Sequence, residues 1–79
     1  MPSYRINYTG PSVEAVRAAT LIADADGIEL TASKPPVRRD DETVLLEFTV
    51  EGTTDDVLDA VASARGQLPE GATVEIAEG

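Results

Sequence analysis

The chain has 79 residues, of which 15 are Asp or Glu, six are Lys or Arg and none is His or Cys, so its formal net charge is −9. Without Cys or His the protein has no disulfide, no thiolate nucleophile, no imidazole relay and no metal site with sulfur or imidazole ligands. A chain this short forms one domain over residues 1–79, and its apolar fraction of 42% is too high for a disordered acidic tail.

The first predicted element is a strand over residues 4–9, in which apolar and polar side chains alternate. Gly10 and Pro11 end this strand. Ser12 is then expected to cap a helix over residues 12–25, because a Ser hydroxyl can accept from the first free amides of a helix.

This helix is expected to bury one stripe of apolar side chains, formed by Ala15, Val16, Ala19, Ile22 and Ala23. Leu21 falls on the other side. We therefore expect Leu21 to be exposed to solvent or to contact another chain.

A second strand is predicted over residues 28–33 and a loop over residues 34–42, because two prolines cannot lie in a central strand. The clearest strand pattern follows over residues 43–51, where every second residue is apolar. Thr53 is expected to cap a helix over residues 54–67.

A last strand is predicted over residues 72–77, after a turn at residues 69–71. The resulting order is βαββαβ, and a shift of 42 residues aligns the first half with the second. We therefore predict an α+β protein of the ferredoxin-like type, with a four-stranded antiparallel sheet and both helices on one face. A swapped or rearranged sheet is the alternative.

One face of such a sheet stays uncovered, and the alternation places polar residues there, together with Leu45. Arg5 should lie on a central strand and pair with Glu47 or Glu75. The face is either simply solvated or a surface for a dimer or a ligand. Because the three aromatic residues fall on the other face and the chain is acidic, we do not expect nucleic-acid binding.

Three of the six basic residues lie in one segment, at Lys34, Arg38 and Arg39. Such a cluster in an acidic chain can bind an anion or an acidic partner. The alternative is local neutralisation by the acidic residues 40–42, which follow directly.

The acidic residues themselves are spread along the whole chain, and Lys occurs only at Lys34. This distribution resembles that of small haloarchaeal proteins, whose surface carboxylates keep them soluble in a salt-rich cytoplasm. An ordinary acidic bacterial domain is the alternative. Because no apolar stretch follows Met1 and no apolar run is long enough to span a membrane, we expect no signal peptide and a cytoplasmic protein.

The turn at Gly10 and Pro11, with Gly27 ahead of the second strand, resembles the turns of ACT-type regulatory domains. These domains share the βαββαβ order and bind amino acids or other small ligands at a dimer interface. The resemblance implies a ligand site at Thr9, Gly10 and Ser12, where the amides of a helix N-terminus can hold a carboxylate.

Two functions remain open at this point. The first is a non-enzymatic module that forms a homodimer or docks on another protein, through surfaces that include Arg5, Leu21, Lys34, Arg38, Arg39 and Leu45. The second is an ACT-like sensor of a small polar metabolite. No catalytic residue, cofactor or metal is predicted, since the acidic runs lack the alternating ligands and central Gly of a calcium loop.

Overall fold

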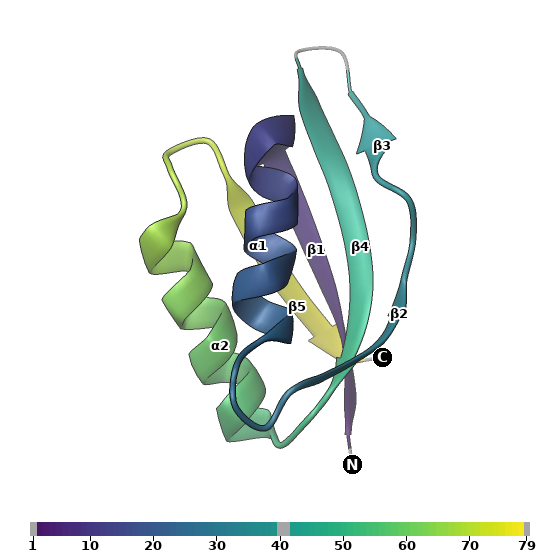
Figure 1. Cartoon of the computed structure of the whole chain (residues 1–79), viewed down its shortest axis with the longest axis vertical. Coiled ribbons are helices and arrows are strands. Elements are labelled where there is room, and N and C mark those ends of the chain that lie inside the picture. The colour runs from purple at the N-terminus through teal and green to yellow at the C-terminus, as the bar shows by residue number, and fades with distance from the viewer. Residues whose placement is uncertain (1, 40–41, 79) are drawn as a thin grey trace.

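The structure is a computed structural model that describes residues 2–39 and 42–78. An antiparallel sheet forms one layer, and two helices cover one of its faces (Figure 1). The elements in chain order are β1 (Ser3–Pro11), the 3₁₀ turn η1 (Ser12–Glu14), α1 (Ala15–Ala23), β2 (Glu29–Ser33), β3 (Val37–Arg38), β4 (Thr43–Glu51), α2 (Thr54–Gln67) and β5 (Thr73–Glu78).

The sheet has the order β2-β4-β1-β5, with all neighbouring strands antiparallel. This is the strand order of a ferredoxin-like α+β fold, so the predicted fold class is confirmed. The two nine-residue strands β1 and β4 pair along their whole length, from Ser3 opposite Glu51 to Pro11 opposite Thr43. As predicted, β1 is central, between β4 and β5.

The predicted loop over residues 34–42 contains one further short strand, which was missed. In β3, Val37 pairs with Leu45 and Arg38 with Val44, so five strands belong to the sheet. Pro35 and Pro36 interrupt the sheet edge after β2. The residues that follow them pair with β4 again. The predicted neutralisation of this segment by Asp40 and Asp41 lies outside the described residues.

The start of the first helix also differs from the prediction. Ser12 is not a helix cap: residues 12–14 form a 3₁₀ turn, with no side-chain cap, and the α-helix begins at Ala15. The backbone N–H of Ser12 is satisfied from another element, because it donates to the Glu42 carbonyl at 3.3 Å.

The buried stripe of α1 is rotated from the predicted one. Ala15, Ala18 and Ile22 are buried, whereas Val16 is 75% exposed. Leu21 is partly buried against the core, so its predicted exposure is wrong. Because Arg17 and Thr20 are the only polar residues of this helix, its apolar side is wide enough for more than one buried stripe.

The core lies between the helices and the sheet. The three aromatic residues are buried in it as predicted, and Tyr4 and Tyr8 keep their hydroxyls satisfied. The Tyr4 hydroxyl is 2.5 Å from the Thr54 hydroxyl, and Tyr8 donates to the Pro11 carbonyl at 2.8 Å. Among the described residues no polar or charged residue is buried.

Candidate interaction surfaces

The residues of the predicted ligand turn are not gathered in one site. Gly10 is buried, and a Cβ atom there would lie 2.8 Å from the Ala72 Cα atom. Gly10 therefore allows the backbone at Ala72 to approach β1 closely. Thr9 is half-buried in β1 between Leu45 and Thr73. Only Ser12 is exposed at the turn.

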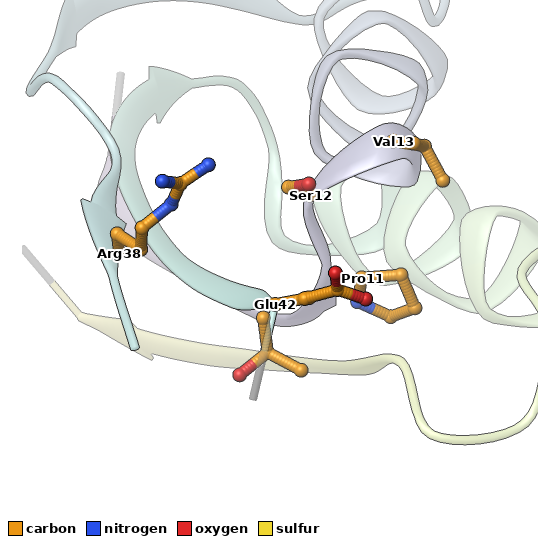
Figure 2. Close-up of a pocket in the computed structure, with 6 residues that line it drawn as sticks. Pro11, Ser12, Val13, Arg38 and Glu42 are labelled. Carbon is orange, nitrogen blue, oxygen red and sulfur yellow. The ribbon is translucent and has the colours of Figure 1, made fainter. Parts of the chain in front are cut away.

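Ser12 does line a pocket, of about 390 Å³, that also includes Arg38 of β3. Figure 2 shows the Arg38 side chain reaching from β3 toward the turn that carries Ser12. The structure thus brings together one residue from each of two predicted sites. Glu42 lines the same pocket, so the pocket contains a carboxylate as well as the Arg38 guanidinium that could hold an anion.

A second hollow, of about 430 Å³, is mostly apolar, and we call it the α1–β2 groove. One wall of the groove is formed by α1, with Val16, Ala19 and Thr20. The opposite wall is formed by Leu30, Pro35 and Pro36. Leu46 and Phe48 of β4 also line it. Val16 is 75% exposed and Leu30 is 47% exposed, so this groove presents apolar side chains to solvent.

The sequence does not predict the α1–β2 groove, because its pattern places Val16 in the buried stripe of the first helix. The one signal for it is that α1 is apolar on nearly all sides, with only Arg17 and Thr20 as polar residues. A helix of this kind is typically covered on more than one side. Val13, just before α1, is 83% exposed, and it lines the pocket of Ser12 and Arg38 rather than this groove.

The charges around the groove differ from those of the whole chain. Residues 15–23 and 30–39 contain no Asp or Glu, although the chain has 15 of them. These two segments carry four of the six basic residues, namely Arg17, Lys34, Arg38 and Arg39. The groove is therefore flanked by the least acidic part of an otherwise strongly acidic protein.

Lys34 makes the shortest ion pair in the described part of the chain, with its Nζ atom 2.9 Å from Oε2 of Glu47. The hydrogen bond from Lys34 lowers the pKa of Glu47 below its usual value, and the charges of Lys34 and Arg5 lower it further. The prediction that Arg5 pairs with Glu47 or Glu75 is wrong, because no ion pair joins Arg5 to a described residue.

The open face of the sheet is mainly polar, apart from Val37 of β3, which is 60% exposed. Arg5 is exposed, and Leu45 is half-buried beside Val37 of β3. The remaining residues are mainly Thr, Asn and Glu, and Thr31 donates to the Thr49 carbonyl at 3.3 Å. This composition is that of a solvated antiparallel sheet face.

Both free edges of the sheet have features that oppose pairing with a strand of another molecule. In the β1–β4 pair the hydrogen-bonding positions of β1 are the even-numbered ones, because Ser12 N–H donates to the Glu42 carbonyl and Gly52 N–H to the Pro2 carbonyl. The odd-numbered positions of β1 therefore bond β5, and Val74, opposite Tyr8, turns its carbonyl outward. Arg65 of α2 donates to this outward carbonyl from Nε at 3.0 Å and from Nη2 at 2.6 Å.

On the opposite edge, β2 has a bulge between Leu30 and Ala32 and is followed by Pro35 and Pro36. Bulges and prolines at a sheet edge oppose the addition of another strand. Because the open face is mainly polar and both edges oppose strand addition, the α1–β2 groove is the surface best suited to bind another protein.

No helix in the described ranges is long and apolar enough to span a membrane. Within the same residues, no group of three or more acidic side chains is placed to hold a metal ion. No known protein family matches the chain, and no curated protein matches it either. Because one fold can carry many functions, a function must be argued from the surfaces described above.

Proposed function

We propose that this protein is a non-enzymatic module that forms a homodimer through the α1–β2 groove. The observation that carries the proposal is the exposure of Val16 and Leu30 beside a groove of about 430 Å³. Burying such side chains against a second copy is favourable by roughly 25 cal/mol for each Å² removed from water.

The size of the molecule is compatible with such an interface. The chain exposes 4872 Å². A standard interface covers about 800 Å² on each partner, or roughly one sixth of that surface. For a small domain with a limited core, dimerisation also adds stability that the single chain lacks.

The proposal includes a salt-rich cytoplasm as the setting, and the dispersed acidic residues support it. A net charge of −9 keeps the surface outside the groove solvated. Because salt screens charge repulsion between the two copies, the apolar contact would persist in molar KCl.

The experiment is a measurement of molecular mass by light scattering in molar KCl, on the wild type and on two matched variants. Leu30→Glu puts a charge beside the groove, and Leu58→Glu puts the same charge on α2. The two leucines are 47% and 49% exposed, so the substitutions are alike in burial and charge. We expect a dimer for the wild type and Leu58→Glu, and a monomer for Leu30→Glu.

A second candidate function is the recognition of a small anionic metabolite. The position of Arg38 across the pocket from Ser12 favours it (Figure 2), and the Glu42 carboxylate opposes it. A thermal-shift panel of amino acids and nucleotides in high salt tests this function. The expected result is a shift that Arg38→Ala abolishes, and the absence of a shift with every compound would rule the sensor out.

A further inference from the structure

The two halves of the chain repeat the same arrangement at two places in the sheet. In the second half, Val74 of β5 lies opposite Tyr8 of β1. In the first half, Leu30 of β2 lies opposite Val50 of β4. Because Val50 follows Tyr8 by 42 residues, which is the shift that aligns the two halves of the sequence, Leu30 and Val74 are equivalent positions on the two outer strands.

The two helices correspond in the same way. The shift of 42 residues brings each buried residue of α1 onto a buried residue of α2. These pairs are Ala15 with Val57, Ala18 with Ala60 and Ile22 with Ala64. Val16 and Leu58, which also correspond, are both exposed. The second half therefore shows how the space between a helix and an outer strand of this protein can be filled.

The space between α2 and β5 is closed. Val61 of α2 and Val74 of β5 are each 2% exposed, and Arg65 donates two hydrogen bonds to the Val74 carbonyl. Val61 and Arg65 are four residues apart, so they are neighbours on one side of the helix. An aliphatic side chain and an Arg thus close this side of the domain.

The equivalent space in the first half is the α1–β2 groove, and it lacks both of these side chains. Ala19 stands where the second half has Val61, and Ala23 stands where it has Arg65. Without them, Leu30 of the outer strand is 47% exposed. The groove therefore lies where an aliphatic side chain and an Arg are missing.

The strand side of the groove is less filled as well. Because α2 and β5 run in opposite directions (Figure 1), Val61, one turn before Arg65, lies toward the Ile76 end of β5. Ile76 lies opposite Ile6 and packs against the core. Its counterpart in β2 is Ser33, opposite Phe48, and Ser33 is exposed and lines the groove.

One backbone group of β2 also lacks the partner that its counterpart has. Leu30 lies opposite Val50, at an even-numbered position of β4, and the even-numbered positions bond β1. The Leu30 carbonyl therefore turns toward the free edge, as the Val74 carbonyl does. Arg65 donates to Val74, but no side chain in the described part of the chain donates to Leu30.

We infer that two copies of the chain fill these vacancies reciprocally, with Val13 and Arg17 of each copy in the α1–β2 groove of the other. Val13 has the place in the groove that Val61 has in the second half, and Arg17 donates to the Leu30 carbonyl in the manner of Arg65. This inference rests on the proposed self-association and adds the residues that enter the groove.

Spacing and exposure fit Val13 and Arg17 for this role. They are four residues apart, as Val61 and Arg65 are, and η1, which contains Val13, runs directly into α1. Val13 is 83% exposed, more than any other large apolar residue in the described ranges. The Arg17 side chain is 53% exposed, and its ion pair from Nη1 to Glu14, at 3.5 Å, leaves Nε and Nη2 for another acceptor.

The same helix carries both sides of the contact. Val16 and Thr20 line the groove, so Val13 and Arg17 lie beside the groove of their own copy. A two-fold symmetric dimer repeats every contact with the roles of the two copies exchanged, so that both grooves are filled at once. A second copy of the chain is therefore the occupant that leaves neither groove open.

Disulfide cross-linking tests the position of Val13, because the chain has no Cys of its own. Val13 precedes Arg17 by about 6 Å along the helix, so with Arg17 at Leu30 it lies over Ser33. Two single variants, Val13→Cys and Ser33→Cys, are mixed in molar KCl and oxidised. A disulfide requires Cα atoms within about 7 Å of each other, so we expect a covalent mixed dimer in mass spectrometry.

A matched control uses the same substitution at another exposed Val. Val37 is 60% exposed and does not line the groove. Val37→Cys, mixed with Ser33→Cys and oxidised in the same way, should give no covalent dimer. Equal cross-linking from Val37→Cys and Val13→Cys would overturn the inference.

A second test fills the groove from within. Ala19→Val/Ala23→Arg gives α1 the two side chains that close the second half, and we expect the dissociation constant of the dimer to rise by about tenfold or more. Ala62→Val/Gly66→Arg introduces the same two residues on the exposed side of α2, where a Cβ atom on Gly66 meets no atom within 4 Å. This control should dimerise like the wild type, and an unchanged affinity of the first variant would overturn the inference.

The hydrogen bond from Arg17 has a test of its own. Arg17→Ala should raise the dissociation constant by about tenfold, as expected for the loss of one hydrogen bond from a charged donor. Arg65→Ala removes the same side chain from the other helix and should leave the dissociation constant unchanged. Equal affinities of the two variants would overturn the part given to Arg17.

The outcomes separate the inference from the proposal beneath it. A monomeric wild type would overturn both. A wild-type dimer that Leu30→Glu disrupts, without a cross-link between Val13→Cys and Ser33→Cys, would overturn the inference and leave the groove interface standing. The cross-link, together with the lower affinity of Ala19→Val/Ala23→Arg, would support the inference.

Discussion

At the scale of single residues, ionisation of the Tyr8 hydroxyl makes the stability of the fold depend on pH. The side chain is buried, and its hydroxyl donates to the Pro11 carbonyl at 2.8 Å. Burial raises the pKa of Tyr8 above its usual value of 10.0, and the charge of Glu14 raises it further. Since the folded state then holds this proton more tightly than the unfolded chain, the stabilisation is complete below about pH 10 and is lost as the pH rises through the raised pKa.

Tyr8→Phe is therefore expected to lower the free energy of unfolding by about 1 kcal/mol at neutral pH, because one hydrogen bond is lost. The variant should also lose less stability than the wild type between neutral pH and a pH above 10. Urea unfolding at the two pH values measures both effects. Equal alkaline losses in the two proteins would contradict the role given to Tyr8.

Glu47 has the opposite pH behaviour. The hydrogen bond from Lys34 holds its pKa below the usual value of 4.5, so its stabilisation is present above that value and is lost as the pH falls through the lowered pKa. In Lys34→Ala the pKa of Glu47 should rise toward 4.5. An NMR titration of the Glu47 carboxyl group measures it, and Lys34→Arg serves as the control that keeps a donor. An unchanged pKa in Lys34→Ala would refute the ion pair.

At the scale of elements, Arg65 links α2 to the free edge of β5. Its two hydrogen bonds satisfy the outward carbonyl of Val74, which would otherwise be available to a strand of another molecule. Arg65→Ala should therefore cost about 1 kcal/mol of stability and increase aggregation on heating. Thermal unfolding followed by light scattering tests this, with Arg5→Ala as the control. Equal aggregation of the two variants would argue against protection of the edge by Arg65.

The elements also differ in how well the sequence predicts them. The strand over residues 43–51 and the helix over residues 54–67 have the predicted bounds, because a regular alternation is followed by Gly52 and by a true cap. Thr53 accepts a hydrogen bond from the Asp56 amide at 3.2 Å, as its position predicts. Here local chemistry and tertiary packing favour the same structure.

Helix α1 and strand β3 were less predictable, because tertiary contacts decide them. The wide apolar side of α1 permits more than one buried stripe, and the stripe that is buried leaves Val16 in the groove. The two residues of β3 become a strand only through their pairing with β4. The groove is formed by α1, β2 and the segment between β2 and β3, so its residues could not be recognised from any one segment of the sequence.

At the scale of the whole molecule, the net charge of −9 produces repulsion within one copy and between two copies. Added salt screens this repulsion over distances beyond about 10 Å at 0.1 M, and over shorter distances as its concentration rises. The midpoint of thermal unfolding should therefore rise with KCl, also in the Leu30→Glu variant, which we expect to be monomeric. A midpoint that falls or stays constant as KCl increases would contradict an adaptation of the surface to salt.

The central question at this scale is whether the α1–β2 groove joins two copies of the chain. The most direct measurement is sedimentation equilibrium of the wild type and of Leu30→Glu in molar KCl, with circular dichroism to show that both are folded. We expect twice the chain mass for the wild type and the mass of a single chain for Leu30→Glu. A wild type with the mass of a single chain, or a Leu30→Glu variant that dimerises as well as the wild type, would contradict the groove dimer.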